Sequence, residues 1–106
     1  MSRAVAIGER GLILGFKGAG IEVLPAEDTD GFKRVLGQIS RQADVALVLV
    51  TETMAEAAPE ALRDFRETST AILTTIPTHK GSNHFSFKEM RRAIERSIGV
   101  DMLGKD

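Results

Sequence analysis

Val45-Ala46-Leu47-Val48-Leu49-Val50 places six apolar residues in a row, between Asp44 and the polar pair Thr51-Glu52. The run is too short for a helix that is buried all round, and a half-exposed strand would alternate apolar with polar residues. A run without alternation is typical of a strand covered on both faces. This stretch therefore predicts the central strand of a parallel sheet.

Three further stretches predict the neighbouring strands. Residues 4–7 form a short apolar run, residues 21–24 alternate, and residues 71–76 are apolar and β-branched; each is followed by glycine or proline, which end regular structure. Glu22 in the second of these stretches indicates a strand at the edge of the sheet. The chain thus supplies four strands.

Helical spacing of apolar residues fills the gaps between these strands. We expect helices over residues 12–19, 30–42, 54–57, 59–67 and 87–98. Gly15 and Gly18 lie three apart in the first, which predicts a close approach of that helix to the sheet, and Gly20 should end it. Thr29 or Asp30 should cap the second helix.

The order βαβαβαβα, with short connections and right-handed crossovers, predicts an α/β fold with an open, doubly wound, four-stranded parallel sheet. We expect two parts. Residues 1–77 form the α/β body, and residues 78–106 form a hinge loop, a C-terminal helix and a tail.

Composition excludes several classes of function. A chain of 106 residues is long enough for one core, and a formal net charge of −1 gives no field that would attract nucleic acid. The absence of cysteine removes disulfides, thiol catalysis and cysteine-ligated zinc. No run approaches the roughly 18 apolar residues of a membrane span, and the first residues do not form a secretory signal. We therefore expect no direct membrane insertion.

Ligands of doubly wound sheets bind at the carboxyl ends of the strands. The polar and glycine residues expected there are Gly8, Glu9, Thr51, Glu52, Thr75, Thr78 and Lys80. A dinucleotide site requires Gly-x-Gly-x-x-Gly, and Gly8-Glu9-Arg10-Gly11 lacks that spacing. The chain also has no Gly-Lys-Ser/Thr pair of a phosphate-binding loop. We expect no nucleotide and no other cofactor.

Other site chemistries also lack the residues they need. A receiver-type phosphoacceptor would need an aspartate at the end of the third strand, where this chain has Thr51-Glu52. His79 and His84 have no third ligand at a suitable spacing, so no metal site is predicted. The acidic residues of 27–30 and 56–67 are typical of helix caps and solvated faces. No catalytic residue emerges.

The last predicted helix carries a narrow apolar stripe formed by Phe87, Met90, Ile94 and Ile98. Basic residues, including Arg91, lie around it. Two interpretations remain open. The stripe packs on the sheet as a fourth covering helix, or it lies on a helix of a partner, as in a coiled coil. We take Phe87, Met90, Arg91, Ile94 and Ile98 as the candidate partner interface.

The assembled stretches resemble the F subunit of the V-type/A-type rotary ATPases. The matching segments, in order, are Ala4–Gly8, Gly15–Lys17, Ala19–Ile21, Val45–Glu52, Ile76–Pro77 and Arg92–Asp101. No single segment is diagnostic, but the ordered set covers nearly the whole chain. One departure is Gly18, where the family more often has a larger apolar residue.

This resemblance implies a receiver-like, Rossmann-like α/β body with a C-terminal helix. It also implies a non-catalytic central-stalk subunit that pairs with the D subunit, the coiled-coil shaft, inside the catalytic A/B ring and near the C subunit of the stalk. Its place would be cytoplasmic and peripheral to the membrane, and it would couple ATP turnover to proton or sodium transport. The alternative is a free-standing receiver-like regulatory or small-ligand-binding domain, with its ligand at Glu9, Thr51, Glu52 and Lys80.

Overall fold

The structure is a computed structural model that describes residues 2–77. The predicted hinge, final helix and tail lie in residues 78–106, outside the described residues. The strands are β1 (Arg3–Gly8), β2 (Glu22–Pro25), β3 (Val45–Thr51) and β4 (Ile72–Ile76). The helices are α1 (Arg10–Ile13), the 3-10 helix η1 (Leu14–Ala19), α2 (Thr29–Ile39), α3 (Glu52–Ala57) and α4 (Pro59–Thr68).

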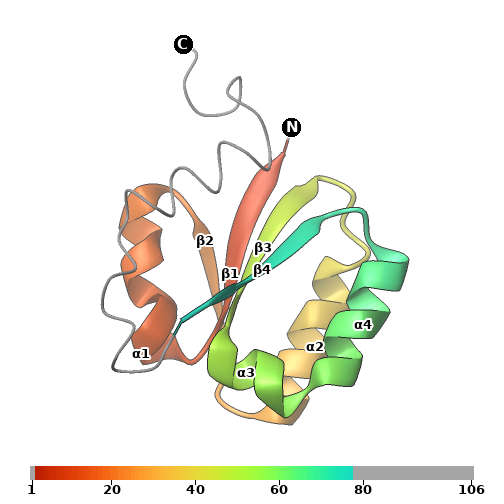
Figure 1. Ribbon diagram of the computed structural model, residues 1–106. Coiled ribbons are helices and arrows are strands. Elements are labelled where there is room, and N and C mark those ends of the chain that lie inside the picture. Colours follow the sequence, from red (N-terminus) through yellow and green to blue (C-terminus); the bar gives the residue numbers. More distant parts are fainter. Residues whose placement is uncertain (1, 78–106) are drawn as a thin grey trace.

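The four strands form one open sheet in the order β2-β1-β3-β4, and every neighbouring pair is parallel (Figure 1). Strand β3 is central, because Val48 pairs with Val5 of β1 on one side and with Leu73 of β4 on the other. Strand β2 is at an edge, as Glu22 indicated. The predicted sheet is therefore confirmed.

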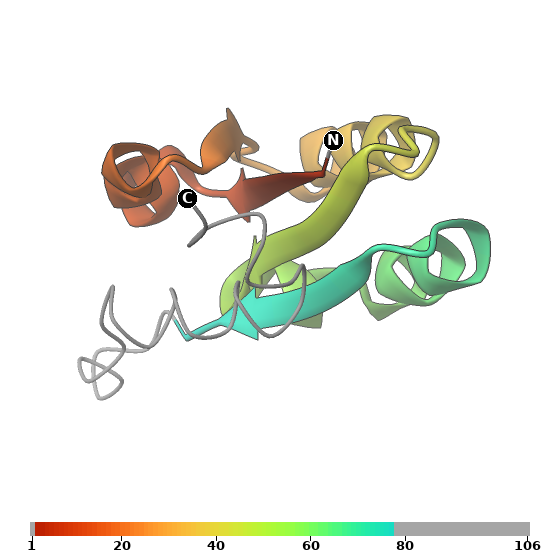
Figure 2. The same cartoon turned by 90° about the horizontal axis from the view of Figure 1, so that it is seen from above.

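Helices cover both faces of the sheet. Figure 2 shows α1 on one side of the strands and α2 and α4 on the other. Side chains of β3 alternate between the two layers: Leu47 and Leu49 belong to the core on the α1 side, whereas Val48 and Val50 belong to the core beneath α2, α3 and α4. Because both faces are covered, the strand needs apolar residues at every position, and the doubly wound prediction is confirmed.

The first helical segment differs from the single helix predicted over 12–19. It begins at Arg10, and after Ile13 it continues as a 3-10 helix to Ala19. Glycine has low α-helix propensity, and this segment contains three glycines, so short, tighter turns replace a longer α-helix.

Two glycine predictions for this segment have different outcomes. Gly20 ends it in the left-handed conformation, with φ 81° and its N–H donating to the carbonyl oxygen of Lys17 at 3.1 Å, as predicted. The close approach to the sheet is wrong at Gly18, since a Cβ there would meet no atom within 4 Å.

Helix α2 is capped by Asp28 rather than by Thr29 or Asp30. The Asp28 carboxylate accepts a hydrogen bond from the N–H of Gly31 at 2.7 Å, whereas Thr29 and Asp30 are the first two residues of the helix itself. The helical spacing of apolar residues predicted for this segment is confirmed, because Phe32, Leu36 and Ile39 are buried on one face of α2.

The connection from β3 to β4 contains the two predicted helical pieces. Helix α4 starts at Pro59, which suits the first turn of a helix because proline lacks the N–H that would be unpaired there. Helix α3 begins directly after Thr51. None of the helices in residues 2–77 combines the length and hydropathy that a bilayer-spanning segment requires.

Arg3 joins three segments at the amino ends of the strands. Its guanidinium donates to Asp44 at 2.8 Å, to Glu22 of β2 and to the side-chain oxygen of Gln42. The hydrogen bond from Arg3 holds the pKa of the Asp44 carboxyl below its ordinary value. The network therefore fixes the start of β1 between its edge neighbour and the loop that enters β3.

Candidate functional site

The carboxyl ends of β1 and β3 meet where the strand order changes direction. From β1 the chain connects to β2 on one side and later returns to β3 on the other. Such a switch point is where doubly wound sheets hold ligands. Gly8 and Glu9 follow from β1, and Thr51 ends β3, so three of the residues proposed from the sequence do come together.

Hydrogen bonds within the chain occupy this corner. The carboxylate of Glu9 accepts a hydrogen bond from the hydroxyl of Thr51 at 2.7 Å and another from the hydroxyl of Thr53. Thr51 is fully buried, whereas Glu9 is partly exposed. The contact links the start of α1 to the start of α3, because Glu9 precedes the first helix and Thr51 precedes the other.

Glycine is required at the end of β1 because Thr51 lies against it. A Cβ on Gly8 would lie 2.9 Å from Cβ of Thr51 and still closer to its two γ atoms. The carbonyl oxygen of Gly8 also accepts a hydrogen bond from the N–H of Ala26 at 2.8 Å. The backbone is thus held between two neighbouring segments and has little room to move away.

We expect Gly8→Ala to lower the free energy of unfolding by about 1–3 kcal/mol, because the added methyl group overpacks this corner. Gly18→Ala is the matched control, since open space surrounds that position. Urea denaturation of both variants measures the difference. Equal stabilities of the two variants would show that the Gly8–Thr51 contact is not restrictive.

The environment of Glu9 favours its ionised form. Partial burial raises the pKa of Glu9, but the hydrogen bonds from Thr53 and Thr51 together outweigh it and leave the pKa below the ordinary value of about 4.5. An ionised carboxylate that accepts one hydroxyl hydrogen bond on each oxygen acts as an internal brace between two segments. The arrangement does not provide the aspartate nucleophile of a phosphoacceptor.

The lowered pKa of Glu9 predicts a loss of stability in acid. Its contribution is fully present above pH 4.5 and is lost as the pH falls through the folded-state pKa, because protonation removes an acceptor. We expect Glu9→Gln to be less stable than the parent at pH 7, by no more than about 1 kcal/mol, and to lose less stability between pH 5 and pH 3. Chemical denaturation at several pH values measures this. A parallel pH dependence in both proteins would contradict the assignment.

The other residues proposed for this edge do not join the corner. Glu52 is the first residue of α3, and the hydroxyl groups of Thr51 and Thr53 donate to Glu9 instead of to Glu52. Thr75 is an exposed residue of β4. Thr78, Lys80 and the interface residues of the last helix lie outside the described residues. Thr53 was not identified from the sequence as a hydrogen-bond partner of Glu9, because its position indicated only the beginning of a helix.

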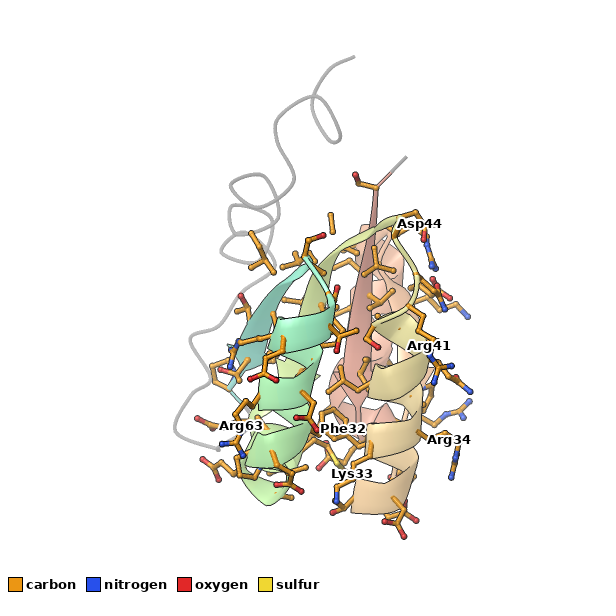
Figure 3. All side chains as sticks on the ribbon, turned by 90° about the vertical axis from the view of Figure 1, so that its right-hand side faces the viewer. Phe32, Lys33, Arg34, Arg41, Asp44 and Arg63 are labelled. Atoms are coloured by element: carbon orange, nitrogen blue, oxygen red, sulfur yellow. The ribbon has the colours of Figure 1, made fainter. Side chains whose placement is uncertain are left out.

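A shallow hollow of about 290 Å³ lies between α2 and α4, the two helices that face the viewer in Figure 3. Lys33 and Glu60 line it and pair with each other at 3.1 Å. In the figure, Arg34 and Arg41 point outward on the far side of α2, away from this hollow. Lys33 and Glu60 thus neutralise each other, and Asp64 is the other charged residue of the lining.

Two observations limit the chemistry of the body. Across residues 2–77, no cluster of three or more histidine or acidic side chains has a geometry that could hold a metal ion. Every buried side-chain nitrogen or oxygen of these same residues has a hydrogen-bond partner.

Comparison with known proteins matches almost the whole chain. Residues 4–96 match the family described as ATP synthase (F/14-kDa) subunit. The F subunit of a V-type ATP synthase from Clostridium botulinum (strain Eklund 17B / Type B) is 25% identical over 97 residues, covering 92% of this chain and 93% of the relative. The F subunit of an A-type ATP synthase from Thermococcus kodakarensis is 27% identical over 105 residues, covering 94% and 97%.

A third relative, the F subunit of a V-type ATP synthase from Fusobacterium nucleatum, is 24% identical over 103 residues and covers 97% of both chains. The identities are modest, but the matches cover nearly the whole length of this chain and of the relatives. The chain therefore belongs to the ATP synthase (F/14-kDa) subunit family, which includes the F subunits of V-type and A-type ATP synthases.

Proposed function

We propose that this protein is the non-catalytic central-stalk subunit of a V-type/A-type ATPase and that it pairs with the coiled-coil D subunit. The observation that carries the proposal is the family match across residues 4–96. The match includes the α/β body and also Phe87, Met90, Arg91 and Ile94 of the predicted partner interface. Both parts of the chain thus belong to what the family shares.

The internal bracing of the body supports a mechanical role. At the carboxyl ends of the strands, where ligands usually bind, Thr51 donates a hydrogen bond to Glu9. At the amino ends, Arg3 pairs with Asp44 and Glu22. A small domain braced at both ends of its sheet is suited to transmit force. In the proposed role it stiffens the shaft and helps couple ATP hydrolysis or synthesis to proton or sodium transport.

The place of the chain in the complex follows from the same proposal. The D subunit is the direct partner, and the catalytic A/B ring and the C subunit of the stalk are neighbours in the assembly. The protein would be cytoplasmic and would associate with the membrane through the complex. Residues 78–106 would act as the partner-binding part, and residues 1–77 as the rigid body.

Co-expression with the D subunit from the same genome tests the proposal. We expect the two chains to elute together in size-exclusion chromatography at a stoichiometry of about one to one, and the pair to show no ATP hydrolysis by itself. After addition of the A and B subunits, we expect the complex to hydrolyse ATP and to retain both chains. Separate elution of this chain and the D subunit would refute the proposed pairing.

A receiver-like regulatory domain is tested in parallel. We expect NMR signals of Glu9, Thr51 and Glu52 to stay unchanged during titration with Mg²⁺ and acetyl phosphate, because the hydroxyl hydrogen bonds already engage the carboxylate of Glu9. Saturable shifts of these three residues would favour the regulatory domain instead.

A further inference from the structure

The two edges of the sheet differ in how they are protected. Strand β2 has four residues, ends with Pro25, and carries Glu22, which pairs with Arg3. A short strand with a charge and a proline is a poor template for another strand, because proline cannot donate to a ladder and a charge resists burial. The β2 edge is thus closed to strand addition.

Strand β4 is one residue longer and lacks both the charge and the proline. Its sequence, Ile72-Leu73-Thr74-Thr75-Ile76, contains no charge and no proline, and it pairs with β3 without a register shift. Among residues 2–77, no strand pairs with its outer edge. Ile72 is 45% exposed, and Thr74 and Thr75 are exposed as well. Such an uncharged edge strand is a template for β-augmentation.

The β4 sequence is complementary to itself when two copies run antiparallel. A two-fold axis at Thr74 places Thr74 opposite Thr74 of the second copy, Ile72 opposite Ile76, and Leu73 opposite Thr75. Four of the five residues are β-branched, which favours cross-strand pairs, and no charge meets a like charge. This register pairs all five residues.

We propose that β4 pairs with β4 of a second copy of this chain, antiparallel about a two-fold axis at Thr74. The product is one continuous sheet with four strands from each copy. A second copy fits better than other strands of the chain, because β2 would bring Glu22 and Pro25 into the ladder. The pairing closes on itself: it uses both β4 edges, and the two outer β2 edges are protected against further growth.

The dimer is weak and depends on concentration. A ladder of five residues buries much less surface than the roughly 1,200–2,000 Å² of a stable protein–protein interface. We expect a dissociation constant weaker than about 1 μM for the isolated chain. The inference concerns the chain alone and does not rest on the proposed function, so binding to the D subunit tests a separate question.

Charge placed at the two-fold axis tests the pairing with the full chain. Thr74→Lys and Thr74→Glu each put like charges directly opposite, and we expect the homodimer dissociation constant of each to rise on the order of fivefold. An equimolar mixture of the two variants places Lys opposite Glu. We expect that mixture to form a heterodimer at least as readily as the parent forms its homodimer, measured by sedimentation equilibrium and native mass spectrometry at low salt.

Gln38→Lys and Gln38→Glu are the matched controls, because Gln38 is exposed on α2 and is not part of the β4 edge. We expect both to dimerise like the parent, singly and mixed. Hydrogen exchange of the parent should also show the outward-pointing amides of β4 losing protection on dilution, while the amides bonded to β3 stay protected. A parent that stays monomeric at millimolar concentration, dimers unaffected at position 74, or a charge-swapped mixture without heterodimers would each overturn the proposal.

Discussion

Phe32→Ala is expected to lower the free energy of unfolding by about 3–5 kcal/mol, a large fraction of the roughly 5–15 kcal/mol that stabilises a typical small domain. Phe32 is the largest of the fully buried side chains in the described residues. It extends from the inner side of α2 into the core that α2, α3 and α4 share with the sheet (Figure 3). Loss of the ring removes apolar contacts and leaves a cavity that neighbouring side chains fill only in part.

Phe32→Leu separates the loss of volume from the loss of apolar character. We expect it to destabilise the protein by less than half as much as Phe32→Ala, because most of the side-chain volume remains. Urea denaturation followed by circular dichroism measures both variants, with the slope of the transition checking that the unfolded states are comparable. Similar losses in both variants would indicate that the ring's shape, rather than the cavity, determines the effect.

The sequence predicted the architecture because burial determines both the residue types and their spacing. Val45–Val50 lacks alternation because helices cover both faces of β3. Phe32, Leu36 and Ile39 recur with helical spacing because one face of α2 packs on the sheet. These patterns depend on the average environment of a residue, and they hold without knowledge of individual contacts.

The helix cap and the hydrogen bonds of Glu9 were harder to predict, because they depend on which polar side chain lies within reach of a given donor or acceptor. Asp28, Thr29 and Asp30 are all capable of capping α2, and only the backbone path shows that Asp28 reaches the N–H of Gly31. Glu9 and Thr53 are 44 residues apart in sequence, so their contact arises only when β1 and β3 lie side by side. Sequence spacing does not register such long-range pairs.

The glycines also show that residue patterns are easier to predict than individual contacts. Gly8 and Gly18 look alike in the sequence, and helical spacing predicts a close approach at the latter. The structure places a side chain against Gly8 and open space around Gly18. A glycine is explained by its neighbour in space, which for Gly8 is Thr51 of another strand. The candidate partner interface in residues 87–98 stays a prediction from sequence pattern and family membership.

Ile94→Asp is expected to weaken binding to the D subunit about 30-fold or more while leaving the α/β body folded. Ile94 is central in the predicted stripe between Met90 and Ile98, and a carboxylate there would have to be desolvated against apolar side chains of the partner helix. Isothermal titration of the purified D subunit into each variant measures the change. Circular dichroism of the free chain verifies the fold.

The control for this variant adds the same charge elsewhere. Gln38→Asp places a carboxylate on an exposed position of α2, so a general electrostatic effect on the D subunit would weaken both variants equally. If only Ile94→Asp loses affinity, the stripe is the contact, because the two proteins have the same net charge. If both retain full affinity, the predicted interface is wrong and the D subunit binds another surface. The parent protein in the same titration tests whether the D subunit binds at all, whereas the variants test which surface it binds.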